Sequence, residues 1–485
     1  MKFLFAVIYI FWFSNSFFLQ KINSPIGDFI EEPSLKNATI SFEIVAIKND
    51  SVISFYQSQK SLIPASTMKL VTTATALDVL GHDFRFKTSL AYDGKIDSNG
   101  VLYGNIYIVG AGDPTLGSKY YTGQNFLKEW LNEIQRLGIK KIKGSVVADG
   151  SCYSDEFIPS TWTWGDIGNY YGAGVTGLSV YDNTVSLLFR SGQNVGDKTI
   201  ITSMDPYVPY FQVKNEVTSD NIKSDQAYIF GAPYSQYRIA RGSIPLNVSD
   251  FSVKASIYDP SFLIAFKLDV LLKENGIELT NPPTTIRKLK EKKLSISSNQ
   301  IEFHEHYSDK LNTIINHTNL ISNNHFAEHI HRAVGAELNK EALASAFSSS
   351  KLIKEYWINK EIKSSGFHMN DGSGLSRNNA LTASFLVDVL CYMKNNSKAF
   401  PYFIESLPIA GKTGTLKYFG RGTILEGKLI AKSGSMQRIR SYAGYYKSNA
   451  NDLLAFAVIV NNYNCTSAEL KKLIEKLLVS ELIKL

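Results

Sequence analysis

Strand patterns at the two ends of the chain limit the fold more than any other feature of the sequence. Residues 40–48 (ISFEIVAIK) and 51–57 (SVISFYQ) are rich in β-branched residues, and the Asn49-Asp50 pair between them is typical of a hairpin turn. Three further apolar stretches come near the end of the chain, at 428–435, 440–448 and 452–463. Residues 467–485 follow with one apolar helix face. Both ends are therefore expected to join one antiparallel sheet with helices packed on it.

The middle of the chain differs from both ends in residue composition and pattern. From about residue 90 to 255 it consists of short strand-like pieces rich in Gly, Tyr, Asn and Asp. Helical spacing is found before and after this stretch, at 64–81, 261–276 and 311–361. We expect an α+β (α/β) fold in which residues 27–90 and 256–485 form one domain, with a central antiparallel sheet flanked by helices. Residues 91–255 are expected to form a large, mostly β insertion that protrudes from it.

The first residues have the features of an export signal. Lys2 precedes the apolar run FLFAVIYIFWF, and the small residues Ser14-Asn15-Ser16 follow it. The run is about eleven residues long, whereas a bilayer-spanning helix needs about 20. Residues 1–16 are therefore interpreted as a cleaved signal peptide. A periplasmic protein without a transmembrane anchor is expected after cleavage.

Charge and cysteine content exclude several other classes of protein. The formal net charge of +7 is not gathered into a basic stripe with interleaved aromatic residues, so nucleic acid is not expected as a partner. Cys152, Cys391 and Cys465 are too few and too scattered for a disulfide framework or a zinc cluster. One bridge is left open, but buried free thiols are the expectation.

A histidine-rich segment invites comparison with a metal site. His325, Glu328, His329 and His331 include histidines at i and i+4, which can share one helix face. The order differs from H-E-x-x-H, and apolar residues between them indicate a helix packed in the protein. A structural or surface role is expected, with no metal and no cofactor.

Two S-x-x-K tetrapeptides are candidates for a catalytic serine and its base. In Ser66-Thr67-Met68-Lys69 one helical turn would bring the lysine under the serine hydroxyl, and a lowered lysine pKa would let it accept the serine proton. The position of Ser66 at a helix start, after a hairpin and Pro64, favours it. Ser348 and Lys351 match equally well but lie in a polar stretch, and are interpreted as a solvated helix surface.

A second and a third motif would complete such a site. Ser322-Asn323-Asn324 lies between two helical segments, where a serine hydroxyl and an amide two residues apart can face one cleft, although turn chemistry also explains it. A Lys-(Ser/Thr)-Gly on a strand edge would let a substrate pair like an added strand.

Two copies of the Lys-(Ser/Thr)-Gly tripeptide compete for that third place. Lys432-Ser433-Gly434 follows an apolar strand and is the candidate. Lys412-Thr413-Gly414 follows Pro408 and leads into a loop, so a structured turn is expected there. A phosphate loop is disfavoured because Ser406 stands where a glycine is required and no apolar strand precedes it.

The ordered trio resembles the motifs of penicillin-binding proteins and serine β-lactamases. More closely, the chain resembles the penicillin-binding protein 4 type, the S13 peptidases, which are D-alanyl-D-alanine carboxypeptidases that also act as endopeptidases. Further matching stretches are residues 104–116, the W-x-W-x-D of Trp162, Trp164 and Asp166, and residues 178–183, 371–377, 407–416 and 431–436. Two motif residues depart from the usual pattern, Asn323 and Ser433, and both keep the hydroxyls and cations that the chemistry needs.

The resemblance implies a penicillin-binding, transpeptidase-like fold, also called β-lactamase-like, and a set of roles. Ser66 would be the nucleophile and Lys69 its base, with Ser322, Asn324 and Lys432 completing the catalytic group. Substrate would be bound by Ser433, Gly434 and Ser435. The pocket for the side chain of the peptide stem would be lined by Asp166, Tyr171, Arg377 and Gln437.

The implied partners are peptidoglycan peptides, with β-lactam antibiotics as inhibitors. Two other functions stay open: a β-lactamase or esterase, for which no deacylating carboxylate motif is recognised, and a wall-binding or penicillin-sensing protein without turnover. The sequence also leaves open whether the protein forms a homodimer.

Overall fold

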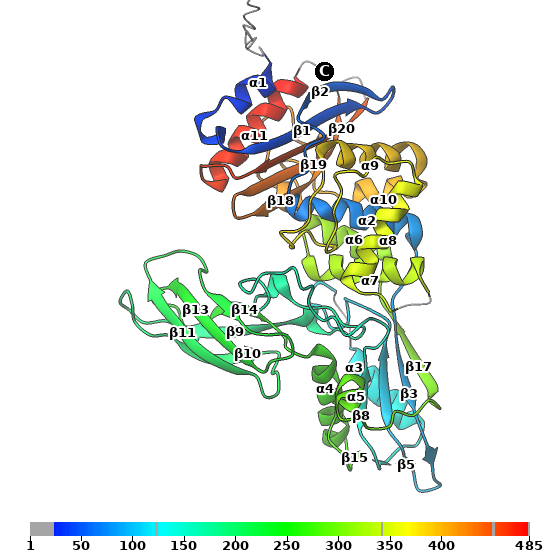
Figure 1. The fold of residues 1–485 in the computed structure, drawn as a ribbon. Helices are drawn as coiled ribbons and strands as arrows, with labels where there is room; N and C mark the ends of the chain where they lie inside the picture. Colours follow the sequence, from blue (N-terminus) through cyan, green and yellow to red (C-terminus); the bar gives the residue numbers. More distant parts are fainter. Residues whose placement is uncertain (1–23, 122–124, 341–342, 449–451, 484–485) are drawn as a thin grey trace, which may run out of the picture.

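The computed structural model describes residues 24–121, 125–340, 343–448 and 452–483. The expected signal peptide, residues 1–16, lies outside the described residues. A sheet with helices on both faces forms one end of the molecule, a helical layer follows, and two β-containing lobes form the other end (Figure 1). None of the described helices is both long and apolar enough to cross a membrane.

The central sheet joins both ends of the chain, as predicted. Its strands are β1 (Thr39–Ala46), β2 (Ser51–Tyr56), β18 (Leu429–Met436), β19 (Ile439–Lys447) and β20 (Leu453–Asn461). The order is β18-β19-β20-β1-β2, and all neighbours are antiparallel. Strand β18, which carries Lys432, is therefore an outer strand.

Helices cover both faces of this sheet. On one face α1 (Pro25–Ile30) and α11 (Ser467–Leu482) pack against Phe42 and Val458, and on the other α2 (Met68–Val79) and α9 (Ala383–Asn396) pack against Ala457. Successive side chains of a strand point to opposite faces. Strands covered on both faces carry long apolar runs, which is why β20 is buried almost throughout.

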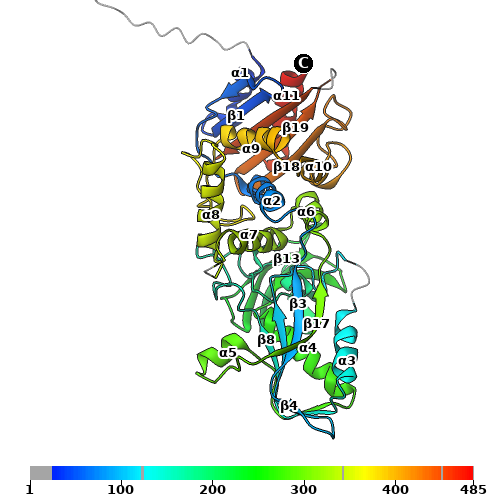
Figure 2. The same cartoon turned by 90° about the vertical axis from the view of Figure 1, so that its right-hand side faces the viewer.

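The helical layer lies between the sheet and the two lobes (Figure 2). It consists of α2, α6 (Leu311–Leu320), α7 (Asn324–Leu338), α8 (Ala346–Asn359) and the short α10 (Phe400–Glu405). Helix α2 is buried on nearly all sides, from Met68 to Leu77. A helix of that kind belongs in the interior, and it fixes the residues at its N-terminus relative to both neighbouring layers.

The inserted region forms two lobes. One holds the sheet β16-β8-β6-β3-β17 and the small sheet β15-β7-β5-β4; the other holds the three-stranded sheets β10-β9-β14 and β11-β13-β12. The first lobe's strands are β3 (Lys87–Tyr92), β4 (Lys95–Ile96), β5 (Val101–Tyr103), β6 (Ile106–Gly110), β7 (Lys141–Ile142), β8 (Val146–Asp149), β15 (Glu278–Leu279), β16 (Thr284–Thr285) and β17 (Ile301–Tyr307). The second lobe's are β9 (Thr184–Arg190), β10 (Ile200–Asp205), β11 (Gln212–Asp220), β12 (Tyr228–Phe230), β13 (Tyr237–Pro245) and β14 (Phe251–Ser256).

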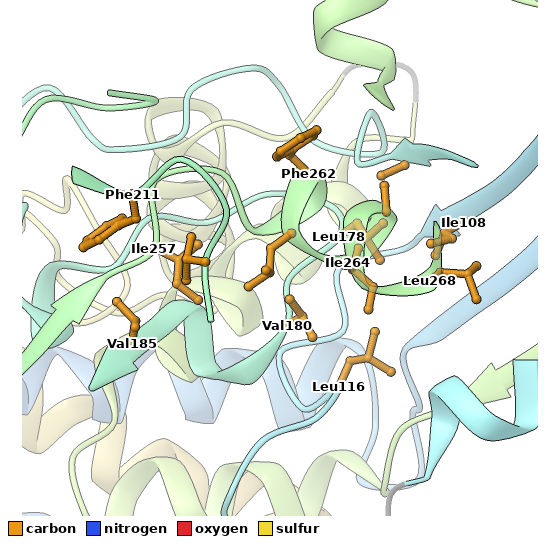
Figure 3. Packing of buried hydrophobic residues seen from close by; sticks show 14 of the residues in the cluster. Ile108, Leu116, Leu178, Val180, Val185, Phe211, Ile257, Phe262, Ile264 and Leu268 are labelled. Carbon is orange, nitrogen blue, oxygen red and sulfur yellow. The ribbon is translucent and has the colours of Figure 1, made fainter. Parts of the chain in front are cut away.

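The inserted region also contains helices α3 (Phe126–Arg136), α4 (Pro260–Glu274) and α5 (Ile286–Glu291). Ile264 and Leu268 of α4 pack in the same core as Ile108 and Leu178 (Figure 3). Strand β17 pairs antiparallel with β3. The expected boundary at residue 255 therefore falls inside one packing unit, and we propose that the insertion runs from about residue 87 to about 307.

The three cysteines pack beside three different hydrophobic clusters. Cys152, Cys391 and Cys465 are free thiols. Free thiols were expected here, and each of the three is half-buried.

Candidate active site

Ser66 is presented by a sharp turn at the start of α2. It lies in the 3-10 turn η2 (Ala65–Thr67), which runs directly into the helix. Ala65 has a φ of 48°, in the left-handed region that side chains other than glycine rarely adopt. Gly374 packs beneath this turn so closely that a Cβ there would lie 1.9 Å from the Ala65 carbonyl oxygen. The backbone is thus held in a strained conformation that exposes the serine hydroxyl.

Lys69 lies under Ser66 as the helical spacing predicts. Its Nζ donates to Ser66 Oγ at 3.0 Å, to Asn324 Oδ1 at 2.7 Å and to the Ser373 carbonyl oxygen at 2.7 Å. The side chain is 0 % exposed. A lysine amine surrounded by three acceptors in this way has a fixed position relative to the hydroxyl.

The second motif lies at the bend before α7. Ser322 has a φ of 61°, and Asn323 caps the helix by accepting the Phe326 N–H at 3.1 Å. This bend turns the Asn324 amide toward Lys69, and it places Ser322 Oγ 2.9 Å from the Lys432 Nζ that donates to it. Two buried amines therefore each donate to a serine hydroxyl in one cluster.

Burial determines the electrostatics of the two lysines. Removal from water lowers the pKa of Lys69 to about 7, against the opposing charges of Asp371 and Glu328. Burial, and then the charge of Lys69, lower the pKa of Lys432 well below its ordinary value. Near neutral pH the Lys69 amine can thus accept a proton, which an ordinary lysine cannot do.

The third motif lies on the outer strand of the sheet. The segment before Lys412 covers the outer edge of β18 as far as Ala431, whose N–H donates to Pro408 O at 2.9 Å. Gly434 faces the η2 turn, where a Cβ would lie 2.6 Å from Pro64 O and 2.9 Å from Ser66 N. Only glycine lets the strand come this close to the Ser66 backbone.

The hydroxyls beside Gly434 have their own partners. Ser433 Oγ donates to Thr415 Oγ1 at 2.8 Å, and Ser435 Oγ accepts from Arg440 Nη1 at 2.9 Å. Arg440 lies opposite Ser435 in the β18–β19 register. The Arg440 guanidinium group therefore lies beside the free end of the strand. No sequence motif predicted it.

The candidate pocket residues are gathered around Ser66. A cavity of about 660 Å³ is lined by Ser66, Ser322, Asn324 and Ser435 together with Asp166, Tyr171, Arg377 and Gln437. Asp166 accepts from Thr163 Oγ1 at 2.5 Å, and the Tyr171 carbonyl accepts from Asn324 Nδ2 at 2.9 Å. The inserted region thus supplies one wall of the cavity, whereas Ser433 is not among its lining residues.

The competing motifs lie elsewhere. Lys412 is exposed in a turn where Thr413 Oγ1 accepts the Ile409 N–H at 2.9 Å. Ser348 belongs to a capping box at the start of α8, and the exposed Lys351 lies 3.8 Å from Glu355. The structure has the expected turn at Lys412. In the second S-x-x-K only Lys351 lies on an exposed helix surface, because Ser349 and Ser350 are buried.

The histidine-rich segment is the buried face of α7. His329 bonds to Gly112 O at 2.8 Å and Ser179 Oγ at 3.0 Å, which ties the helix to the inserted region. Burial lowers the pKa of His329 to about 3, so the ring is neutral. His331 bonds to Ser350 Oγ at 3.0 Å. No group of three side chains able to hold a metal ion is found in the part of the chain that the structure describes.

Two buried carboxyl groups support the site, and sequence reasoning assigned them no such role. Asp371 accepts from Trp162 Nε1 at 2.7 Å and from the backbone N–H of Gly374 and Ser376. Glu328 accepts the Ser373 N–H at 2.7 Å. Asp371 opens the DGSG turn (residues 371–374), and an aspartate before two glycines and a serine is the signal that predicts such a turn.

The chain is similar over most of its length to proteins of known activity. The profile of the D-Ala-D-Ala carboxypeptidase 3 (S13) family matches residues 22–481. A D-alanyl-D-alanine carboxypeptidase from an Actinomadura species is 26 % identical over 467 residues, which cover 92 % of this chain and 82 % of the relative. The D-alanyl-D-alanine carboxypeptidase DacB of Haemophilus influenzae is 26 % identical over 442 residues, covering 90 % and 88 % of the two chains.

Solved structures give the same fold. Penicillin-binding protein 4 of Haemophilus influenzae superposes with a TM-score of 0.80 over 94 % of this chain and 99 % of that one, at 24 % identity. A predatory endopeptidase of Bdellovibrio bacteriovorus, in complex with an immunity protein, covers 92 % and 93 % with a TM-score of 0.51 at 16 % identity. The penicillin-binding fold expected from the sequence is thereby confirmed. The chain belongs to the S13 family, the serine-type D-Ala-D-Ala carboxypeptidases, and is a hydrolase of that class.

Proposed function

We propose that this protein removes the terminal D-alanine of peptidoglycan stem peptides through an acyl-enzyme on Ser66. The observation that carries the proposal is the contact between Lys69 Nζ and Ser66 Oγ at 3.0 Å, made by an amine whose pKa burial lowers to about 7. A serine hydroxyl is a weak nucleophile until an adjacent base takes its proton. Lys69 has both the position and the lowered pKa that are needed to accept the proton of Ser66.

The proposed acylation transfers one proton around the cluster. Ser66 Oγ attacks the carbonyl carbon between the two D-alanines while Lys69 accepts the hydroxyl proton. Ser322, which accepts from Lys432 at 2.9 Å, passes a proton to the leaving amine and is reprotonated by the lysine pair. The C–N bond breaks, D-alanine leaves, and water later hydrolyses the ester by the same groups.

Charge that develops on the substrate oxygen would be stabilised by backbone N–H groups. Ser66 N–H at the start of α2 and Ser435 N–H on β18 are the proposed donors, each of which contributes on the order of 3 kcal/mol in such sites. The close approach of Gly434 to the Ser66 backbone supports this pairing. Asn324, between Lys69 and the Tyr171 carbonyl, would hold the acyl-side amide.

The two ends of the substrate would meet different chemistry. The terminal carboxylate would be bound by the hydroxyls of Ser433 and Ser435, with the Arg440 guanidinium next to the latter. The side chain of the stem's diamino acid would enter the cavity lined by Asp166, Tyr171, Arg377 and Gln437. There the Asp166 carboxylate is a suitable partner for an ammonium group.

We further propose that the protein binds penicillin, cleaves D-alanyl cross-links as an endopeptidase, and works in the periplasm. A structure of the Haemophilus influenzae protein holds a β-lactam, and the cavity of about 660 Å³ leaves room for a branched peptide beside Ser66. The apolar start of the chain supports export.

A paired assay tests the proposal. The purified protein is incubated with a fluorescent penicillin and, separately, with a pentapeptide that ends in D-Ala-D-Ala. Stable labelling and D-alanine release, both lost in Ser66→Ala, are expected. Ser348→Ala is the matched control and should retain both activities. Rapid penicillin turnover would favour a β-lactamase, and labelling without D-alanine release would favour a penicillin sensor. A cross-linked muropeptide dimer as third substrate tests the endopeptidase activity.

A further inference from the structure

Glu328 is connected to the catalytic lysine through a single residue. The side chain, on α7, is 1 % exposed, and its Oε1 accepts the Ser373 N–H at 2.7 Å. The carbonyl oxygen of the same Ser373 accepts from Lys69 Nζ at 2.7 Å. Carboxyl group, peptide groups and amine thus form one hydrogen-bonded chain from α7 to α2.

The second carboxyl oxygen of Glu328 has a different environment. Oε2 is buried without a hydrogen-bond partner among the described residues. The groups that face the carboxyl are Asp371 on the DGSG turn, Lys69 on α2, and His331 and Arg332 on its own helix; His331 Nδ1 is 3.9 Å away. Arg332 also lies 3.4 Å from Glu156. Burial lowers the pKa of His331 well below its ordinary value, so this ring is neutral, and among the described residues no close ion pair neutralises Glu328.

A purely structural role does not require a carboxyl group here. Accepting one N–H needs only an oxygen, which glutamine supplies, whereas a buried carboxyl is costly when it ionises. Burial and the nearby Asp371 raise the pKa of Glu328 to about 7, the same range to which burial brings Lys69. The charge of Glu328 therefore changes over the pH range in which Lys69 changes its own.

We propose that Glu328 is a positioning residue for Lys69: it holds the Ser373 peptide whose carbonyl fixes the amine, and its charge favours the protonated form of that amine. The inference rests on the proposed role of Lys69 as base. When Glu328 is ionised Lys69 retains its proton more readily, and when Glu328 is neutral Lys69 releases it at a lower pH.

The test is the pH dependence of acylation by a fluorescent penicillin in Glu328→Gln. Glutamine keeps the oxygen that accepts from Ser373 and removes the charge. The acidic limb of the rate profile is expected to move to lower pH by about half a unit to one unit. Glu156→Gln is the matched control, because it removes the carboxyl group that pairs with Arg332 without touching Ser373, and its limb should stay in place.

A second variant separates charge from shape. Glu328→Asp keeps the charge but shortens the side chain, so the rate is expected to fall at every pH with the limb unmoved. A limb that does not move in Glu328→Gln, or that moves equally in both variants, would overturn the inference. Ser66→Ala distinguishes this failure from a failure of the proposed function. If Ser66→Ala is still labelled, the proposed acyl-enzyme on Ser66 is wrong, whatever pH profile Glu328→Gln gives.

Discussion

The two Lys-(Ser/Thr)-Gly tripeptides have nearly the same letters and very different surroundings. Lys432 is 0 % exposed on the outer strand of the sheet and donates to Ser322 Oγ at 2.9 Å. Lys412, twenty residues earlier in the chain, is exposed in a turn. Burial lowers the pKa of Lys432 well below its ordinary value. The reactivity of such a tripeptide therefore depends on the strand that carries it and on the buried cluster around it.

The glycines of the two copies show the same difference. Gly434 lies against the backbone of Pro64 and Ser66 at the start of α2, so a side chain there would collide with the turn that presents Ser66. Gly414 has a φ of 53°, and a Cβ there would lie 2.4 Å from the Leu320 carbonyl oxygen, so its missing side chain lets its turn pack on the end of α6. One glycine supports the reactive geometry and the other supports the loop that covers part of β18.

The largest expected effect comes from removing each lysine in turn. Lys432→Ala should lower the acylation rate by about 10²- to 10⁴-fold, because Ser322 loses the donor that orients it for proton transfer. Lys412→Ala should leave the rate within about twofold, as for a surface group outside the site. Stopped-flow labelling with a fluorescent penicillin measures both. The reverse ranking would mean that the first copy is the functional one.

Gly434→Ala is expected to have the next largest effect. The added Cβ would press on Pro64 O and Ser66 N, and a displacement of the nucleophile by about 1 Å lowers the rate by about 100-fold. Thermal unfolding should show that the protein remains folded. Gly422→Ala is the control: nothing lies within 4 Å of its Cβ position, so the strain from its φ of 75° falls on an exposed turn and the rate should match the wild type. A wild-type rate in Gly434→Ala would refute the close approach.

The pH dependence of acylation should reflect the buried lysine. Because burial lowers the pKa of Lys69 to about 7, the free amine is lost as pH falls through 7. The rate should therefore drop about tenfold for each pH unit below that point. Lys412→Ala should give the wild-type profile. A rate that keeps rising toward pH 10 would show that Lys69 has the pKa of an ordinary lysine.

The hydroxyls of the two copies should give the smallest difference. Ser433→Ala removes a group proposed to bind the terminal carboxylate and should raise KM for the pentapeptide about tenfold, the effect of one hydrogen bond to a charged group. Ser433→Thr keeps the hydroxyl and should stay close to the wild type. Thr413→Ala should not change KM. An equal KM in all three variants would show that the Ser433 hydroxyl does not bind the substrate.

Sequence periodicity predicted the parts of the fold in which local pattern and burial agree. The hairpin at β1 and β2, the three final strands and α11 were expected, because alternating or continuous apolar residues reflect the faces that helices cover. The spacing within Ser66–Lys69 also predicted a contact, since one helical turn fixes the distance between the two side chains.

What periodicity could not predict is which surface a helix packs on. The pattern at 261–276 predicted a helix correctly, but α4 packs in the core of the inserted region rather than on the central sheet. Glu328 contacts Ser373, 45 residues away in the sequence, and Arg440 contacts Ser435 on the neighbouring strand; single charged residues of this kind carry no spacing signal. Their positions follow from the tertiary contacts alone.

The central claim is that Ser66 is the nucleophile of this cluster, and the most direct test is to locate the covalent adduct. The wild-type protein is treated with penicillin and cut with trypsin, and the fragments are sequenced by mass spectrometry. The account predicts the added mass on Ser66, within the peptide from Ser61 to Lys69. An adduct on Ser322 or Ser348, or no adduct on a protein that still releases D-alanine, would contradict it.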